Sequence, residues 1–264
     1  AKVGLPKDEL CHKPACCINP NPVKTTTIDA CGLQCPGPIM KLKKSVEQLA
    51  NGERIEILAT DAGFPRDAEA WCRTTGNKLI SSSANGGRFS VVIEKADAQM
   101  PSTTSSQAGD GKTFILFSDD LDKALATFVL ANGAAATGKK VSIFFTFWGL
   151  NAIKKEQKPL VKKDIFGKMF GFMLPSSSKK LALSKMNMLG IGAKMMRFIM
   201  KNKGIDSLES LRQQAIDNGV EFIACQMSMD VMGVKKEELL DNVTIGGVAT
   251  YMDRAVQSNV NLFI

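Results

Sequence analysis

The chain has 264 residues, of which 44% are hydrophobic and 23% are charged, so wholesale disorder and a fibrous repeat are excluded. The formal charge is +8, but residues 151–203 hold 13 Lys and Arg against 2 Asp and Glu, while the rest of the chain holds 21 against 24. The basic character belongs to one segment, and we therefore expect no nucleic-acid partner.

Histidine and cysteine usage narrows the chemistry further. The one histidine, His12, lies near the amino terminus, which argues against a histidine-assisted nucleophile and excludes a multi-histidine zinc site. Seven cysteines are too few for a secreted disulfide scaffold, and the sequence has neither a signal-peptide pattern nor an apolar run of about 20 residues. We expect a cytoplasmic protein. The chain begins at Ala1 rather than Met, which fits a piece of a longer protein.

Two stretches lack the periodicity of folded elements. Residues 1–24 contain four prolines and three cysteines and are predicted to be an irregular tail. Residues 97–111 are rich in Ser, Thr and Gly, which is typical of a flexible linker. The tail also brings together four soft ligands, Cys11, His12, Cys16 and Cys17. Their spacing differs from the cysteine pairs of zinc ribbons, so we expect no metal site.

Residues 25–96 are predicted to form a compact unit with the element order β-α-β-α-β-β. Period-2 alternation and turn residues predict four strands, at residues 26–30, 54–59, 78–83 and 88–94. An apolar stripe over residues 39–49 and a helical pattern over 66–75 predict two helices. We expect a two-layer sandwich of two helices on a small mixed sheet.

Residues 112–264 alternate strands with helices over a longer stretch. The predicted strands lie at residues 113–117, 141–147, 220–224 and 260–264, and the predicted helices at 121–136, 207–218 and 247–257. Such alternation indicates a doubly wound parallel sheet. The basic segment 151–203 interrupts it and holds 7 of the 13 methionines, so we expect an insertion that forms a lid or an interface.

Cys35 stands between the first strand and the first helix of the small unit. Pro36 and Pro38 suit a first helical turn, because proline lacks the N–H that has no partner there. Cys35 is therefore expected near the helix N-cap, where free amides and the helix dipole lower a cysteine pKa. Three lysines add positive potential: Lys41, Lys43 and Lys44. The alternative is a proline-marked helix start with an incidental cysteine.

The run IDACGLQCPGP at residues 28–38 resembles the signature of the TusA/SirA-like sulfur-carrier family. Six later positions fit the same family: Asp61, Asp67, Trp71, Cys72, Gly76 and Leu79. The resemblance covers about residues 25–96 and implies that Cys35 carries a persulfide, which is received from a donor and passed to an acceptor thiol.

The sequence departs from that family in two places. Ala62 follows Asp61 where members commonly have proline, which should affect a turn more than the chemistry. Cys31 occupies a position that is often not cysteine. It either ends a strand as a small hydrophobe or resolves Cys35 into a disulfide, whereas Cys72 is expected in the core.

Cys225 follows the buried strand predicted at residues 220–224, and so stands at the carboxyl end of a parallel strand. Ligands and reactive groups collect at that end of open α/β sheets. Residues 226–230 are predicted to start a short helix, which would place Cys225 near another positive dipole end. A buried structural cysteine is the alternative.

Residues 112–264 are similar to the DsrE/DsrF-like sulfur-relay proteins, and most of all to their longer, peroxiredoxin-like subgroup. The matching stretches are residues 147–150, 184–188, 224–233 and 261–264. The resemblance implies a flavodoxin-like fold, self-association into a homo-oligomer, and Cys225 as the residue that holds transferred sulfur. A dedicated peroxidase is less attractive, since this half has no identifiable resolving cysteine.

The simplest interpretation of the insertion 151–203 is a solvated lysine face beside a Met-rich packing surface. Met-rich surfaces also suit partner docking, and lysines steer anionic partners or sulfur oxyanions such as thiosulfate, here around Cys225. Peripheral membrane contact is a minor alternative, because the apolar residues are unevenly spaced for an interfacial helix.

Together these features predict a cytoplasmic sulfurtransferase or sulfur carrier that uses no cofactor. Sulfane sulfur is expected to travel as a persulfide or thiosulfonate on Cys35 and Cys225, in a direction left open. Family analogy suggests a rhodanese-type or flavin-dependent disulfide reductase as donor or acceptor. Two alternatives remain: a thiol redox or peroxide-reducing enzyme that uses Cys31 and Cys35, and a non-catalytic docking scaffold. The tail cysteines have no assigned role.

Overall fold

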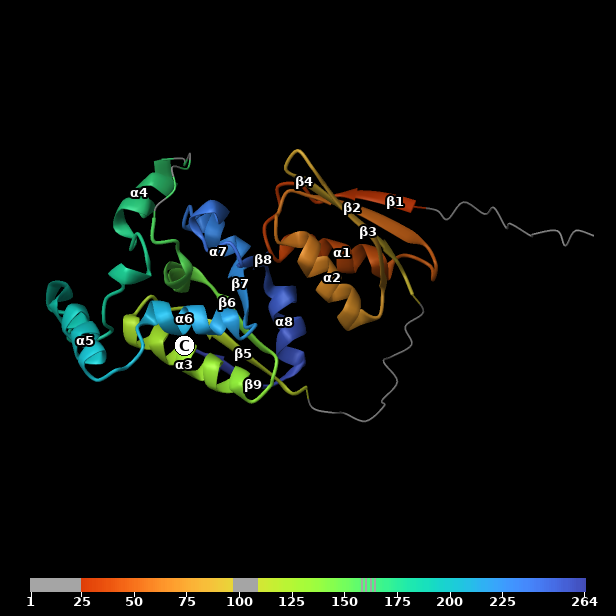
Figure 1. The fold of residues 1–264 in the computed structure, drawn as a ribbon. Coiled ribbons are helices and arrows are strands. Elements are labelled where there is room, and N and C mark those ends of the chain that lie inside the picture. Colours follow the sequence, from red (N-terminus) through yellow and green to blue (C-terminus); the bar gives the residue numbers. More distant parts are fainter. Residues whose placement is uncertain (1–24, 97–108, 158, 160, 162, 164) are drawn as a thin grey trace, which may run out of the picture.

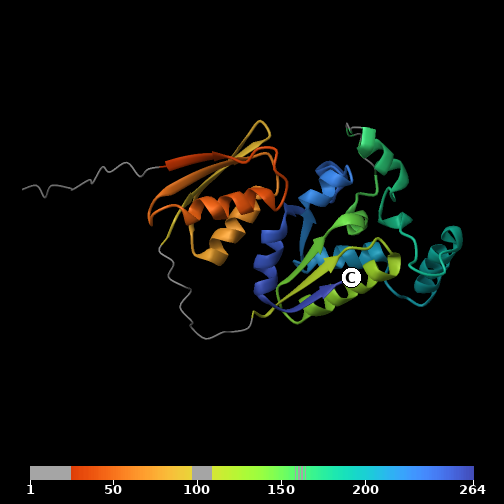
Figure 2. The ribbon, with the colours of Figure 1, turned by 180° about the vertical axis from the view of Figure 1, so that it is seen from behind.

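The computed structural model of the protein describes residues 25–96, 109–157, 159, 161, 163 and 165–264. The predicted tail, its candidate metal ligands and most of the predicted linker lie outside these residues. The described chain forms two α/β units that lie side by side, residues 25–96 and residues 109–264 (Figures 1 and 2).

The first unit has the predicted element order. In chain order its elements are β1 (Thr25–Asp29), α1 (Gly37–Glu47), β2 (Arg54–Ala59), α2 (Phe64–Thr75), β3 (Lys78–Asn85) and β4 (Arg88–Glu94). The sheet order is β1-β2-β4-β3, with β1 parallel to β2 and the other pairs antiparallel. The predicted two-layer sandwich with a mixed sheet is confirmed.

Alternation along β2 sends every second side chain into the core of the first unit. Ile55 and Ile57 are buried there against Leu42 of α1 and Val91 of β4. Cys72 on α2 lies in the same core, as expected, and burial raises the pKa of its thiol to about 12. Cys72 is therefore a packing residue.

The second unit is a five-stranded sheet, and all four of its strand pairs are parallel. Its strands are β5 (Gly111–Leu116), β6 (Val141–Phe145), β7 (Glu221–Cys225), β8 (Thr244–Gly246) and β9 (Ser258–Phe263), in the order β8-β7-β6-β5-β9. The parallel sheet was predicted, but the three-residue β8 was missed because it is too short to show periodicity. β5 begins at Gly111, the last residue of the predicted linker.

Helices cover both faces of this sheet. The longer helices are α3 (Leu121–Ala136), α6 (Leu208–Asp217) and α8 (Val248–Val256), and the shorter helices are η1 (Phe147–Ile153), α7 (Gln226–Val231) and η4 (Lys236–Glu238). Phe145 and Phe222 pack against Phe128 of α3, whereas Phe144 packs against Tyr251 of α8. The sheet is therefore doubly wound, consistent with a flavodoxin-like domain, and α8 covers the face nearer the first unit (Figure 1).

The insertion forms α4 (Ile165–Met173), η2 (Ser178–Lys180), η3 (Met188–Gly190) and α5 (Ile191–Asn202). The expectation of a Met-rich packing surface is wrong for most of it. Met200 is buried, but the other six methionines are exposed: Met169, Met173, Met186, Met188, Met195 and Met196. α5 lies at the far side of the second unit from the first unit (Figures 1 and 2). Among the described helices, none combines the length and apolarity needed to cross a membrane.

Truncation of Phe128 is expected to destabilise the second unit. Its ring is fully buried between Phe145 and Phe222, so Phe128→Ala should lower the free energy of opening of this unit by about 3–5 kcal/mol. Amide hydrogen exchange of β6 and β7 measures this energy. The matched control is Val129→Ala on the same helix, where the side chain is 55% exposed. Equal effects of the two substitutions would contradict the prediction.

Candidate functional site

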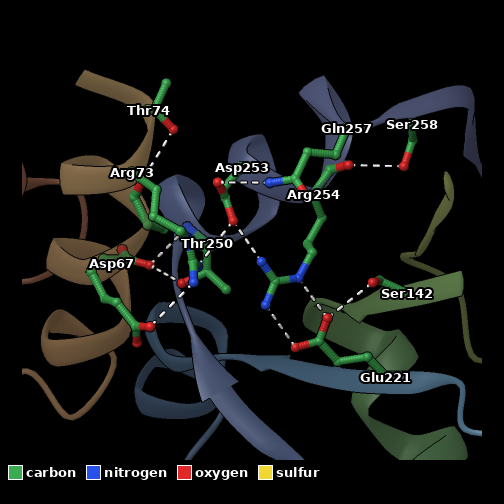
Figure 3. Close-up of polar contacts among 12 residues, drawn as sticks. Asp67, Arg73, Thr74, Ser142, Glu221, Thr250, Asp253, Arg254, Gln257 and Ser258 are labelled. Atoms are coloured by element: carbon green, nitrogen blue, oxygen red, sulfur yellow. Dashed lines mark hydrogen bonds and ion pairs between the residues drawn. The ribbon is translucent and has the colours of Figure 1, made fainter. Parts of the chain in front are cut away.

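The two units meet mainly where α2 packs against α8. Two acidic side chains dominate this junction, Asp67 from α2 and Asp253 from α8, and both are buried. Figure 3 shows them among the polar contacts that join the units. Polar groups buried at a junction must find partners, so each of these contacts constrains how the units fit together.

Asp67 caps a helix of the other unit. The N-cap residue of α8 is Gly247, which has no side chain to satisfy the free amides of the first turn. Asp67 is 2% exposed, and its Oδ1 accepts hydrogen bonds from Gly247 N (2.8 Å), Thr250 N (3.0 Å) and Thr250 Oγ1 (2.5 Å). The carboxylate also lies at the positive end of the helix dipole.

A second set of contacts runs from α2 to the sheet of the second unit (Figure 3). Arg73 Nη2 lies 3.0 Å from Asp253 Oδ2, which also pairs with Arg254. Arg254 donates two hydrogen bonds to Glu221 at the start of β7, and Ser142 of β6 donates another to the same carboxylate. The junction is therefore held by polar groups from both units.

Cys35 lies against the first turn of α8, at the edge of this junction. Its thiol donates a long hydrogen bond to Asp67 Oδ2 (3.8 Å), and Val248 N donates one to Cys35 Sγ (3.5 Å). α1 begins at Gly37 with Pro36 as N-cap, so the observed cap lies one residue after Cys35, where it was predicted. Pro38 is buried in the first turn, as expected.

The expected lowering of the Cys35 pKa is wrong in this arrangement. Burial raises the pKa of Cys35 to about 11, the Val248 amide offsets part of that, and the charges of Asp67, Asp61 and Cys225 raise it further. Two of the three lysines expected to help make contacts elsewhere. Lys41 bonds to the Asp29 carbonyl and Lys43 pairs with Glu47. The second unit and the nearby carboxylates thus favour the neutral thiol.

Asp61 adds a second carboxyl group beside Cys35. It is buried, it accepts a hydrogen bond from Gly63 N (2.8 Å), and it accepts another from the Cys35 backbone N–H. Burial raises the pKa of Asp61, and the charge of Asp67 raises it further. Asp61 thus shapes the turn before α2 and lies close to the reactive sulfur.

Cys225 lies beside the turn that joins β8 to α8. It ends β7, is 6% exposed, and stands at the N-cap of α7 as predicted. Its Cα is paired with Gly246 in the sheet, and a Cβ on the next residue, Gly247, would lie only 2.7 Å from Cys35 Sγ. Cys35 and Cys225 therefore both lie next to the β8–α8 turn.

Cys31 occupies the turn after β1 and is partly exposed. Its backbone N–H donates to Asp29 Oδ1 (2.8 Å), and a side-chain hydrogen bond to Asp29 raises the pKa of the thiol. Cys31 and Cys35 are both free thiols. Among the described residues, no group of three His, Cys, Asp or Glu side chains is arranged to hold a metal ion.

The sequence patterns identified the two cysteines but not Asp67 and Gly247, through which the two units contact each other beside them. Asp67 was noted only as a position that fits a family, and Gly247 only as the start of a helix. A charged residue inside a helix pattern does not disclose that its partner is a helix some 180 residues away. The available signal was a predicted helix, residues 247–257, that begins without a capping side chain.

The raised pKa of Cys35 predicts slow alkylation of the full chain. The rate at Cys35 should rise with pH towards a midpoint near 11, because only the thiolate reacts. At pH 8 it should be about 100-fold below that of a cysteine with the ordinary pKa of 9.0. Peptide mass spectrometry after iodoacetamide treatment measures this, with urea-unfolded chain as control. A midpoint below pH 9 in the folded chain would contradict it.

The same shift links pH to contact between the units. The contact favours protonated Cys35, so its contribution is complete below the ordinary cysteine pKa and is lost as the pH rises towards 11. The contact between the units should therefore weaken across this alkaline window.

The chain has recognisable relatives in both halves. Residues 109–263 match the family described as DsrE/DsrF/DrsH-like, and residues 26–95 match the family described as sulfurtransferase TusA. A Bacillus subtilis protein named YrkE is 47% identical over 58% of this chain and 95% of its own length. Two Allochromatium vinosum proteins are also similar. Sulfur carrier protein DsrE2 is 38% identical over 54% of this chain and 91% of its own length, and sulfur carrier protein TusA is 39% identical over 26% and 91%.

Each match covers one of the two units, and together they cover most of the described chain. The resemblances noted in the sequence are confirmed on both sides of the junction. The chain belongs to the DsrE/DsrF/DrsH-like family and carries a TusA domain in tandem with that domain, so it is a member of the sulfur-carrier families.

Proposed function

We propose that the protein relays sulfane sulfur between Cys35 and Cys225 within one chain. The observation that carries the proposal is that both thiols lie at the β8–α8 turn, one from each unit. Cys35 is held there by Val248 and Asp67, and Cys225 ends the strand paired with β8. A relay needs two thiols close together at the moment of transfer, and the position of both cysteines beside one turn supports the proposal.

The transfer step is redox-neutral. Cys225 Sγ attacks the outer sulfur of a persulfide on Cys35, a new S–S bond forms, and the old one breaks with its electron pair left on Cys35 Sγ. The proton that Cys225 loses balances the proton that Cys35 gains. The outer sulfur moves and no oxidant is consumed.

The surroundings of Cys35 favour handover from Cys35 to Cys225. The product of that direction is Cys35 as a free thiol, and burial with two nearby carboxylates stabilises this neutral form. This preference concerns the equilibrium: the same raised pKa makes Cys35 a slow leaving group in this direction and a poor nucleophile in the reverse one. Cys225 is the N-cap residue of α7.

The partners of such a relay follow from its chemistry. A rhodanese-type protein or a flavin-dependent disulfide reductase, both of which handle sulfane sulfur, would load Cys35 or unload Cys225. The apolar surface of α4 and α5 fits self-association or partner docking, since Phe172 is 92% exposed. A homo-oligomer formed through the second unit and a cytoplasmic location are part of this proposal.

Sulfur labelling read cysteine by cysteine tests the relay. After incubation with polysulfide or thiosulfate, wild type should carry added sulfur on both Cys35 and Cys225. Cys225→Ser should still load Cys35. Cys35→Ser should lose at least about 90% of the label on Cys225, because the carrier is the entry point in this scheme.

Two other cysteines serve as controls in the same digest. Cys72→Ala removes a buried core thiol and should leave both labels unchanged. Cys31→Ser should also leave both labels unchanged. If wild type instead reduces peroxide rapidly and Cys31→Ser loses this activity, the redox alternative is favoured. Absence of sulfur on Cys35 and Cys225 with a competent donor present would refute the relay.

A further inference from the structure

Gly247 is a glycine for a reason that lies outside its own unit. Its backbone angles, φ −123° and ψ −158°, are extended and open to any residue. A Cβ there would nevertheless lie 2.2 Å from Asp67 Oδ2 and 2.7 Å from Cys35 Sγ. Apart from Gly247 and its two chain neighbours, the three atoms nearest to that Cβ all belong to the first unit. The missing side chain therefore makes room for the other unit rather than for the β8–α8 turn itself.

The junction has the character of a contact that opens and closes. Each hydrophobic core cluster in the described residues draws on one unit alone. The identified bonds between the units are instead hydrogen bonds and an ion pair, made mainly by Asp67 and Arg73. Polar interfaces between domains of one chain resemble transient complexes, for which relative motion is expected.

The closed junction suits transfer of sulfur from Cys35 to Cys225, but it hinders loading of Cys35 by an external donor. It holds Cys35 at the turn shared with Cys225, but it also buries Cys35 in part and favours its neutral form. An external sulfur donor needs an accessible thiolate at Cys35. The closed arrangement is thus poorly suited to loading.

We infer that Asp67 and the first turn of α8, Gly247–Thr250, form a latch that switches the first unit between two tasks. With the latch closed, Cys35 faces Cys225 and hands sulfur over. With the latch open, Cys35 is exposed and accepts sulfur from an external donor. This inference rests on the proposed relay for its meaning, whereas the latch itself is a property of the junction that is measured without sulfur.

Asp67 is the positioning residue of this latch. Its Oδ1 binds the α8 turn while its Oδ2 receives the Cys35 thiol, so one carboxylate ties docking to the reactive sulfur. Thr250 supplies the matching hydroxyl and is itself buried. Loss of either side of these bonds should open the latch.

The first test uses alkylation and needs no sulfur chemistry. Gly247→Ala changes no residue of the first unit, but its methyl group clashes with Asp67 and Cys35 and so separates the two units. Cys35 should then react with iodoacetamide faster than in wild type at pH 7.5. Complete opening would raise the rate by up to about 100-fold, as the thiol pKa returns to its ordinary range. Gly133→Ala on α3 is the matched control, because a Cβ there meets nothing within 4 Å.

Substitutions at Asp67 and Thr250 test the same latch from both sides. Asp67→Ala and Thr250→Val should each speed alkylation, and Asp67→Asn should lie between Asp67→Ala and wild type because its amide oxygen still accepts from α8. If Gly247→Ala and Asp67→Ala both react at the wild-type rate, the latch is wrong.

The second test separates the latch from general damage. In Gly247→Ala, loading of Cys35 by polysulfide should be faster than in wild type, while transfer onward to Cys225 should be at least about tenfold slower per loaded Cys35. Damage to the fold would slow both steps, and that result would overturn the two-task switch. Faster alkylation with no sulfur on either cysteine in any variant would leave the docking latch standing and refute the relay instead.

Discussion

One carboxylate, that of Asp67, governs how the two units of this chain meet. A helix that begins at glycine has no capping side chain for its first amides. When these amides are buried, the element that packs against them must supply a hydrogen-bond acceptor. Asp67 reaches across from α2 and satisfies the first turn of α8, in a position where its charge also meets the helix dipole. The position of Cys35 follows from this bond, because the same carboxylate receives its thiol.

The electrostatics of Cys35 are set by the junction rather than by its own helix. Taken alone, a cysteine before a helix with nearby lysines favours the thiolate. Once the second unit covers it, burial and the carboxylates of Asp67 and Asp61 outweigh the one amide donor, Val248. The sulfur therefore has two chemical characters in one chain, and the arrangement of the units selects between them.

Local patterns were sufficient to predict most of the fold. Residues 121–136 were predicted as a helix and form α3, because its apolar spacing and flanking turns are all local. The parallel sheet followed from alternation of strands and helices. β8 escaped notice because three residues carry no period, and its place is decided by pairing with β7.

The candidate site divides in the same way. Cys35 and Cys225 were found because a strand end and a helix start are local features. Their common location, and the role of Asp67, depend on contacts between residues far apart in sequence. The exposed methionines of α4 and α5 belong to the same class, since composition indicates an adaptable apolar surface but not whether this chain covers it.

The fit around Gly247 has a consequence for how this sequence can vary. A residue is usually restrained by its own fold, but here the β8–α8 turn would accept a side chain and the neighbouring unit would not. Selection on this glycine therefore acts through the partner unit. Chains that have the second domain alone are free of that restraint. In an alignment, glycine at the Gly247 position should therefore accompany a first unit that has aspartate at the Asp67 position.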